Sequence, residues 1–250
     1  MKKIAMMQPA FMPWQGLFEL ILRSDVFIYL DDFQFVVQSH HTRNKLFVNS
    51  GQVDYYTVPI QKSVSFEKPI NQTQILNNPA WKKKILKRLI NVYGRTMYFG
   101  DIYSTIESWI NGTYSSLAQL NISGIDSVCN LLRIDTPRLY SSDFTRETQS
   151  NAVRTRRVEE IISWAGATQY LSAFGSFDYM KSDGYDTEKF PVMFQNFIPK
   201  PYIQLQSAEF VPYLSVWDSL LNVGVEETRN LIEHGTEKWL TYKEREAINA

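Results

Sequence analysis

The chain has 250 residues, of which 44% are hydrophobic and 14% aromatic, which is enough for a sizeable core in one α/β domain or in a domain with an appended subdomain. Basic and acidic residues both number 26, and this zero net charge argues against a protein that coats nucleic acid or a membrane surface. The single cysteine, Cys129, excludes an internal disulfide, and no run approaches the roughly 18 apolar residues of a membrane span, so we expect a soluble, cytoplasmic protein with no membrane insertion.

The N-terminal segment predicts a strand, a helix and a second strand. The run "KIAMMQ" is typical of a short buried strand, and Pro9 and Pro13 interrupt it too early for a signal peptide. Leu17 and Ile21 then have helical spacing, and "VFIYL" has the length and composition of a strand covered on both faces. A strand, a helix and a strand this close together form a right-handed unit with parallel strands. We therefore predict an α/β fold with a Rossmann-like open, mostly parallel sheet.

The middle of the chain changes from strands to helices. The runs "HHTRNKLFVN" and "DYYTVPIQK" predict two strands around a turn at residues 50–52, and "FEKPINQTQI" predicts a loop and a further strand. The run "NPAWKKKILKRLINVYG" predicts a helix that ends at Gly94, and two or three helices follow. We assign residues 78–134 to an inserted helical subdomain, and residues 1–77 and 135–250 to the α/β core domain.

The C-terminal part returns to α/β character. The run "DTPRLYSSDF" predicts a strand, and "SNAVRTRRVEEIISWAGATQYLSA" predicts a helix that stops at Gly166 and a strand after it. The tail "LSVWDSLLNVGVEETRNLIEH" predicts a helix with a break at Gly224.

Polar side chains follow the first two predicted strands. In an open parallel sheet, ligands bind at the carboxyl ends of the strands, where loops and free N–H groups converge. Trp14 offers a face for stacking, and Asp31 and Asp32 offer acceptors for a metal or a ribose. Alternatively, the aspartates cap a turn and Trp14 only packs. The residues assigned to substrate binding or catalysis on these two segments are Gln8, Trp14, Gly16, Asp31, Asp32 and Gln34.

The run "HHTRNKL" places a basic cluster shortly after the second strand. Arg43, Asn44 and Lys45 suit recognition of a phosphate or carboxylate, because the guanidinium can donate two parallel hydrogen bonds. His41 could act as an acid or base near neutral pH. The alternative is a solvated basic edge strand. Together with the strand ends, the cluster predicts one polar crevice near Trp14, Asp32 and Arg43.

The run "GATQYLSAFGSFDYM" is a second candidate for substrate binding. A strand would be followed by Ser172, Gly175 and Ser176 and then by a helix that begins near Asp178, an arrangement that can hold an anion. It lacks the Gly-Lys-Ser/Thr of a Walker loop and the spacing of the dinucleotide fingerprint. A plain helix cap is the alternative. No zinc-type spacing of Cys and His occurs, and we assign no metal.

Several of these runs resemble the WbqC-like family. They are "QPAFMPWQGLFELILRSDVFIYLDDFQF" with the "RNKL" that follows, "GATQYLSAFGSFDYM" and "LSVWDSLLNVG". The resemblance implies a bacterial protein of O-antigen and other surface-polysaccharide (lipopolysaccharide) biosynthesis. More remotely, the N-terminal unit is similar to pantothenate synthetase-type nucleotide-binding folds, which adenylate a carboxylate and join it to an amine. This chain has "PWQG" in place of their His-x-Gly-His loop.

These features lead us to expect a transferase that forms an amide, by moving an acyl or aminoacyl group (glycyl included) to the amine of a nucleotide-linked amino sugar. Asp31, Asp32 or His41 would accept the amine proton, and Arg43 and Lys45 would hold a phosphate or the developing oxyanion. The donor would be activated by ATP or arrive already activated, with aminoacyl-tRNA as one version because "WKKKILKR" is a basic helix face.

Two alternatives remain open at this point. One is a metal-dependent glycosyl- or nucleotidyltransferase, in which Asp31 and Asp32 bind Mg²⁺ that bridges phosphates. The other is a non-catalytic protein that binds a sugar nucleotide within a biosynthetic complex.

Overall fold

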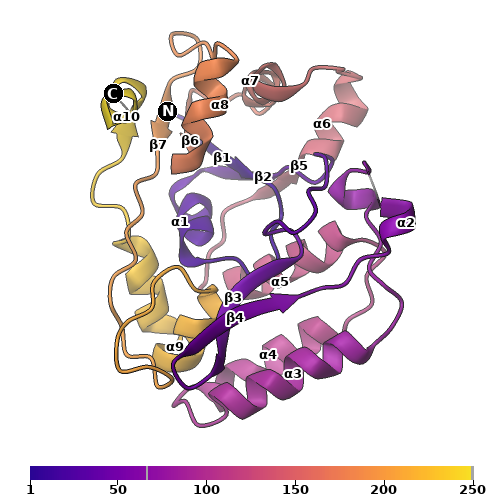
Figure 1. The fold of residues 1–250 in the computed structure, drawn as a ribbon. Helices are drawn as coiled ribbons and strands as arrows, with labels where there is room; N and C mark the ends of the chain where they lie inside the picture. The colour runs from indigo at the N-terminus through magenta and orange to yellow at the C-terminus, as the bar shows by residue number, and fades with distance from the viewer. Residues whose placement is uncertain (66, 249–250) are drawn as a thin grey trace.

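A six-stranded, mostly parallel sheet forms the centre of the molecule (Figure 1). The computed structural model describes residues 1–65 and 67–248. The strand order is β5-β2-β1-β6-β7-β8, with β8 antiparallel to β7 and the other neighbours parallel. The strands are β1 (Lys3–Met7), β2 (Val26–Tyr29), β5 (Arg138–Tyr140), β6 (Gln169–Ser172), β7 (Val192–Phe194) and β8 (Leu240–Thr241). The predicted Rossmann-like α/β class is confirmed.

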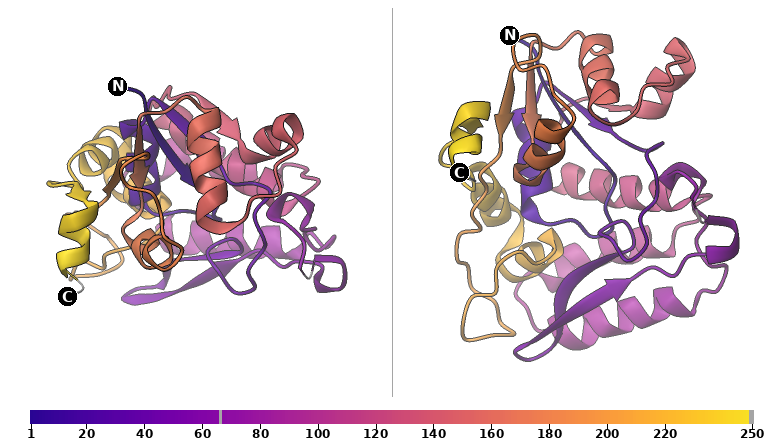
Figure 2. Two further views of the ribbon diagram at one scale, coloured as in Figure 1. Left: turned by 90° about the horizontal axis from the view of Figure 1, so that it is seen from above. Right: turned by 45° about the horizontal axis from the view of Figure 1, so that its top comes forward.

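Helices cover both faces of this sheet, because successive side chains of each strand point to opposite faces and both sets are apolar. Ala5 and Phe27 belong to the core cluster on one face, and Ile4 and Ile28 to the cluster on the other. On the side of the first face lie α1 (Gln15–Arg23), α5 (Leu117–Leu131) and α9 (Val216–Glu233), and α3 (Ala80–Tyr93) and α4 (Phe99–Asn111) pack beyond them in the same core cluster. The second is covered by α6 (Ser141–Thr148), α7 (Arg154–Trp164), α8 (Phe177–Ser182) and α10 (Tyr242–Ile248); Figure 2 gives two further views. None of the helices described is long and apolar enough to cross a membrane.

The helices between residues 80 and 131 share a core with the rest of the chain. Trp109 of α4 stacks on Trp217 of α9, with 5.9 Å between the ring centroids. Cys129 of α5 is buried in the same cluster, as its apolar surroundings predict. The three helices occupy the segment assigned to a helical subdomain; its boundaries as a separate domain remain a prediction.

A β-hairpin of β3 (Arg43–Asn49) and β4 (Gln52–Thr57) lies apart from the main sheet and packs on α3 (Figure 1). Its turn is at the predicted position. A short helix, α2 (Lys62–Ser65), and a 3-10 turn, η1 (Ile70–Gln72), follow the hairpin. The further strand expected in "FEKPINQTQI" is wrong, since within residues 67–75 the structure has this turn and isolated bridges, such as that of Gln34 with Pro69, and no strand.

The chain reverses its direction of travel across the sheet at β1. From β1 it proceeds through α1 to β2 and later to β5, whereas β6 and β7 lie on the other side of β1. The carboxyl ends of β1 and β6 therefore border the topological switch point, where open α/β sheets bind ligands. In α9, the predicted break is present at Gly224, whose φ of 79° is non-helical.

Candidate functional site

A cleft opens at the switch point between β1 and β6. It consists of three adjoining cavities of about 800, 320 and 290 Å³, and Met7 at the end of β1 lines all three. We name them by their lining: the serine cavity (with Ser172 and Ser176), the histidine cavity (with His40) and the aromatic cavity (with Phe197). The next residue, Gln8, lines both the serine and the histidine cavities.

The side chain of Gln8 is fixed by His41. The buried imidazole of His41 accepts a hydrogen bond from the Val36 N–H at Nδ1, so its Nε2–H donates to the Gln8 Oε1 at 2.9 Å. Burial, with a smaller contribution from His40, lowers the pKa of His41 to about 4, and the ring is therefore neutral at pH 7. With its oxygen engaged, Gln8 has its amide N–H groups left to donate to a ligand in the cleft.

The exposed imidazole of His40 faces the histidine cavity itself. Burial and the charges of Arg43 and Lys45 lower the pKa of His40, so it is a neutral base at pH 7. Arg43 and Lys45 lie over the ring of Tyr55, 4.3 and 5.6 Å from its centroid. Asn44, between them in β3, is buried and lines the histidine cavity. The charges of Arg43 and Lys45 thus act on His40, although neither of these two side chains lines the cavity.

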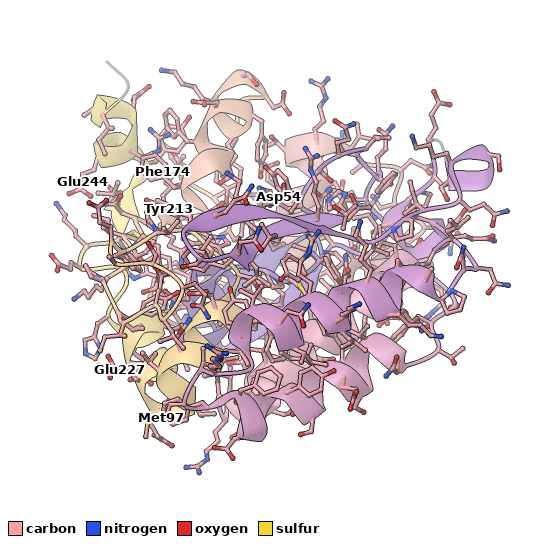
Figure 3. The ribbon with its side chains drawn as sticks, turned by 60° about the horizontal axis from the view of Figure 1, so that its bottom comes forward. Asp54, Met97, Phe174, Tyr213, Glu227 and Glu244 are labelled. Carbon is pink, nitrogen blue, oxygen red and sulfur yellow. The ribbon has the colours of Figure 1, made fainter. Side chains whose placement is uncertain are left out.

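Trp14 separates the histidine cavity from the aromatic cavity and lines both. Its ring meets Phe197 edge-on at a centroid distance of 5.1 Å and packs at a tilt against Tyr213 at 5.5 Å. Gly16 permits this position, because a Cβ there would lie 2.4 Å from the Trp14 Cζ2. Figure 3 labels Phe174 and Tyr213, two of the residues that line the aromatic cavity, on the same side of the molecule.

The predicted Ser/Gly loop after β6 borders the cleft. Ser172 is fully buried, and its Oγ lies 2.5 Å from the Ser176 Oγ. Gly175 lines both the serine and the aromatic cavities. Two predicted site residues are not among the described residues that line the cleft. Gln34 pairs with Pro69, and Asp178 lies in the first turn of α8.

The carboxylates of Asp31 and Asp32 point away from the cleft, toward α6. Asp31 accepts hydrogen bonds from the backbone N–H and hydroxyl of Ser142 at 3.0 and 2.8 Å. Asp32 accepts one from Thr145 at 2.7 Å and forms an ion pair with Arg157 at 2.6 Å. These contacts attach the end of β2 to the start of α6.

The structure therefore divides the single crevice expected near Trp14, Asp32 and Arg43. Trp14 lines the cleft, Arg43 lines none of its three cavities but acts by its charge on His40, and Asp32 is held by α6 and α7. Whether either aspartate takes part in catalysis stays a prediction. Within residues 1–65 and 67–248, no group of three or more His, Cys, Asp or Glu side chains is arranged to hold a metal ion.

Comparison with known proteins identifies the family. A model of the WbqC-like protein family matches residues 8–230, most of the chain. The chain belongs to the WbqC-like protein family. It is also 28% identical over 228 residues to the uncharacterized protein Rv1507c of Mycobacterium tuberculosis, a match that covers 90% of this chain and 96% of that protein. No solved structure matches the chain.

Parts of the cleft in this WbqC-like chain come from the segment between β7 and α9, which contains none of the site residues assigned from the sequence. Ser215 pairs with Trp14, and its N–H donates to the Lys45 carbonyl at 3.0 Å, which brings Tyr213 to the cleft. Gln195 directly follows β7, so the rule that sites follow strand ends would have found it. Its amide donates to the Gly16 carbonyl at 2.9 Å.

A buried carboxylate supports this side of the cleft. Glu19 of α1 is fully buried and accepts hydrogen bonds from Gln195 at 2.6 Å and from the Thr236 backbone at 2.9 Å. Burial raises the pKa of Glu19, although these hydrogen bonds oppose the increase. Its contacts attach α1, and with it the Trp14 loop, to the end of β7.

Proposed function

We propose that this WbqC-like chain is a transferase of surface-polysaccharide (O-antigen) biosynthesis, which forms an amide by acyl or aminoacyl transfer to the amine of a nucleotide-linked amino sugar. The observation that carries the proposal is the place of Gln8. Its fixed amide lies between a cavity large enough for a nucleotide and a small cavity with a neutral histidine. A substrate that spans both cavities would bring its sugar amine to His40.

The serine cavity suits the nucleotide. Its volume of about 800 Å³ falls in the range of pockets that enclose small ligands. The hydroxyl of Ser176, which is bonded to the buried Ser172, and the backbone at Gly175 can contact a diphosphate, and Phe33 and Tyr179 can contact the base. The sugar would then extend past Gln8 toward the indole of Trp14.

The histidine cavity suits the reaction. In the proposed step the amine nitrogen attacks the acyl carbonyl, an N–C bond forms, and the bond between the carbonyl carbon and its leaving atom breaks. That atom is an oxygen in an ester or acyl phosphate and a sulfur in a thioester. His40 would accept the proton of the amine and return it to the leaving atom. The amide N–H groups of Gln8 and Asn44 would donate to the developing oxyanion.

Residues predicted as catalytic from the sequence have supporting roles in this proposal. His41 would act by orienting Gln8, since both of its ring nitrogens are engaged. Asp31 and Asp32 would hold the end of β2, and Arg43 and Lys45 would attract the phosphate groups of a reactant to the mouth of the cavity.

The test combines binding and mass spectrometry. UDP-linked amino sugars are screened by thermal shift, and any binder is incubated with glycyl-AMP, glycyl-tRNA or acetyl-coenzyme A. We expect the mass of the sugar to increase by the acyl group, and His40→Asn to abolish this increase while thermal-shift binding persists. The control His234→Asn changes an exposed histidine at the end of α9 and should leave the reaction intact.

Two outcomes would overturn amide formation. Binding without any change of mass would favour the non-catalytic sugar-nucleotide protein. Release of the nucleotide only in the presence of Mg²⁺ would favour the glycosyl- or nucleotidyltransferase.

A further inference from the structure

A basic groove lies between the turn of the β3–β4 hairpin and α3, away from the cleft. It has a volume of about 930 Å³ and is lined on the hairpin side by residues such as Asn49 and Gln52. Its cationic lining residues are Lys84, Lys87, Arg88 and Arg95. The described lining contains no carboxylate, so the groove carries a net positive charge.

The cations share one side of α3 because of their spacing. Trp81, Ile85 and Leu89 face the core, whereas Lys87 and Arg88 lie three and four residues after Lys84 on another side. Like charges at these intervals destabilise a helix, and within the described part of the chain none of the groove cations forms an ion pair with a carboxylate. An anionic ligand would relieve this repulsion.

Positive charge continues from the groove to the mouth of the cleft. The guanidinium of Arg88 lies 3.5 Å from the Tyr55 carbonyl, and the ring of Tyr55 lies under Arg43 and Lys45. The five steps along β3 from Asn49 to Asn44 span about 17 Å, at about 3.3 Å per residue. The exposed Asp54, labelled on the hairpin in Figure 3, is the acidic residue beside this path.

We propose that the groove and this path bind the sugar–phosphate backbone of RNA, and that the RNA carries the aminoacyl donor as an ester. A groove that continues as spaced cations with an aromatic ring fits a flexible polyanion, whose phosphates pair with the cations and whose bases stack on the ring. A phospholipid surface needs no groove. In the transfer step, which rests on the proposed function, the ester C–O bond breaks and the ribose hydroxyl receives the proton that His40 took from the amine.

The experiment measures RNA binding directly, by fluorescence anisotropy with a labelled single-stranded RNA of about 12 nucleotides, a length within known single-strand site sizes. We expect the double variant Lys84→Glu/Lys87→Glu to bind at least about tenfold more weakly. Its slope of log affinity against log salt should fall by about 1.4, because each lost phosphate contact contributes about 0.7. Lys83→Glu is the matched control, since it makes the same charge change at an exposed position outside the groove.

Absence of RNA binding by the wild type, or an equal loss in the Lys83 variant, would overturn the proposal. The proposal would also be overturned if the wild type bound anionic phospholipid vesicles but not RNA, and the double variant lost the binding to vesicles. Binding of UDP-linked amino sugars is measured in parallel. If no sugar binds but RNA binding depends on the groove cations, only the proposed function of the cleft is refuted. If a sugar binds but RNA does not, only the groove proposal is refuted.

Discussion

The imidazole of His41 holds the side chain of Gln8 at the centre of the cleft, with 2.9 Å between His41 Nε2 and Gln8 Oε1. The other ring nitrogen accepts from the Val36 N–H. A protonated His41 would lose this acceptor and would place a charge in a buried position. The orientation of Gln8 therefore depends on a neutral His41.

We predict that His41 makes the fold less stable in acid. Its pKa is about 4 in the folded chain and about 6.5 when unfolded, so the unfolded chain binds more protons between these values. Its contribution is complete above about pH 6.5 and declines as the pH falls toward 4. The free energy of unfolding, measured with urea, should decrease by about 2 kcal/mol more in the wild type than in His41→Asn between pH 7.5 and pH 5. The same decrease in both proteins would contradict the prediction.

We predict that the ring of Trp14 contributes to ligand binding. Trp14→Ala should weaken binding of a UDP-linked amino sugar about tenfold, because a stacked ring contributes about 1–1.5 kcal/mol, and Trp14→Phe should weaken it less. Quenching of tryptophan fluorescence by the sugar should be lost in Trp14→Phe and kept in Trp164→Phe, which changes a ring on α7 remote from the cleft. Quenching that depends on Trp164 instead would refute this role.

We predict that an alanine at residue 16 displaces the indole of Trp14. The added Cβ would lie 2.4 Å from the Trp14 Cζ2, so the ring must shift or the helix must move. Gly16→Ala should lower the free energy of unfolding by about 1–3 kcal/mol and shift the emission maximum of Trp14. Gly100→Ala is the control, since nothing lies within 4 Å of its added Cβ and alanine favours the α4 helix.

The βαβ unit and the loop that follows β1 were predictable because their signals are local. Apolar runs of strand length and a helical stripe identify β1, α1 and β2, and strand ends in such units face one edge. Gln8 and Trp14 line the cleft at the end of β1, where this reasoning places them, and their role there stays a prediction. Which of two adjacent histidines faces the cavity depends on how the loop before β3 packs, and no short pattern encodes it.

Contacts between distant segments were not predictable. Asp31 and Asp32 contact partners in α6 and α7 that are more than a hundred residues away in the sequence. The sequence alone therefore cannot distinguish aspartates that face a ligand from aspartates that hold the fold together. Tyr213 reaches the cleft through the pairing of Ser215 with Trp14, which is equally non-local. The spacing of the lysines and arginines in the sequence predicted the basic side of α3. The packing of the β3–β4 hairpin against it, which forms the groove, was not predictable.

We predict that the ion pair of Asp32 with Arg157 stabilises the fold. The side chains are only 12% and 17% exposed, and Arg157 joins α7 to the end of β2. Arg157→Met should lower the free energy of unfolding by about 2–3 kcal/mol, because it leaves a largely buried carboxylate without its cation. Arg156→Met is the matched control: Arg156 is 80% exposed and pairs with Glu160 within α7, so its loss should cost less than about 0.5 kcal/mol. Equal losses in urea unfolding would contradict this role, and loss of Mg²⁺ binding in Asp32→Asn would instead favour a metal site at these aspartates.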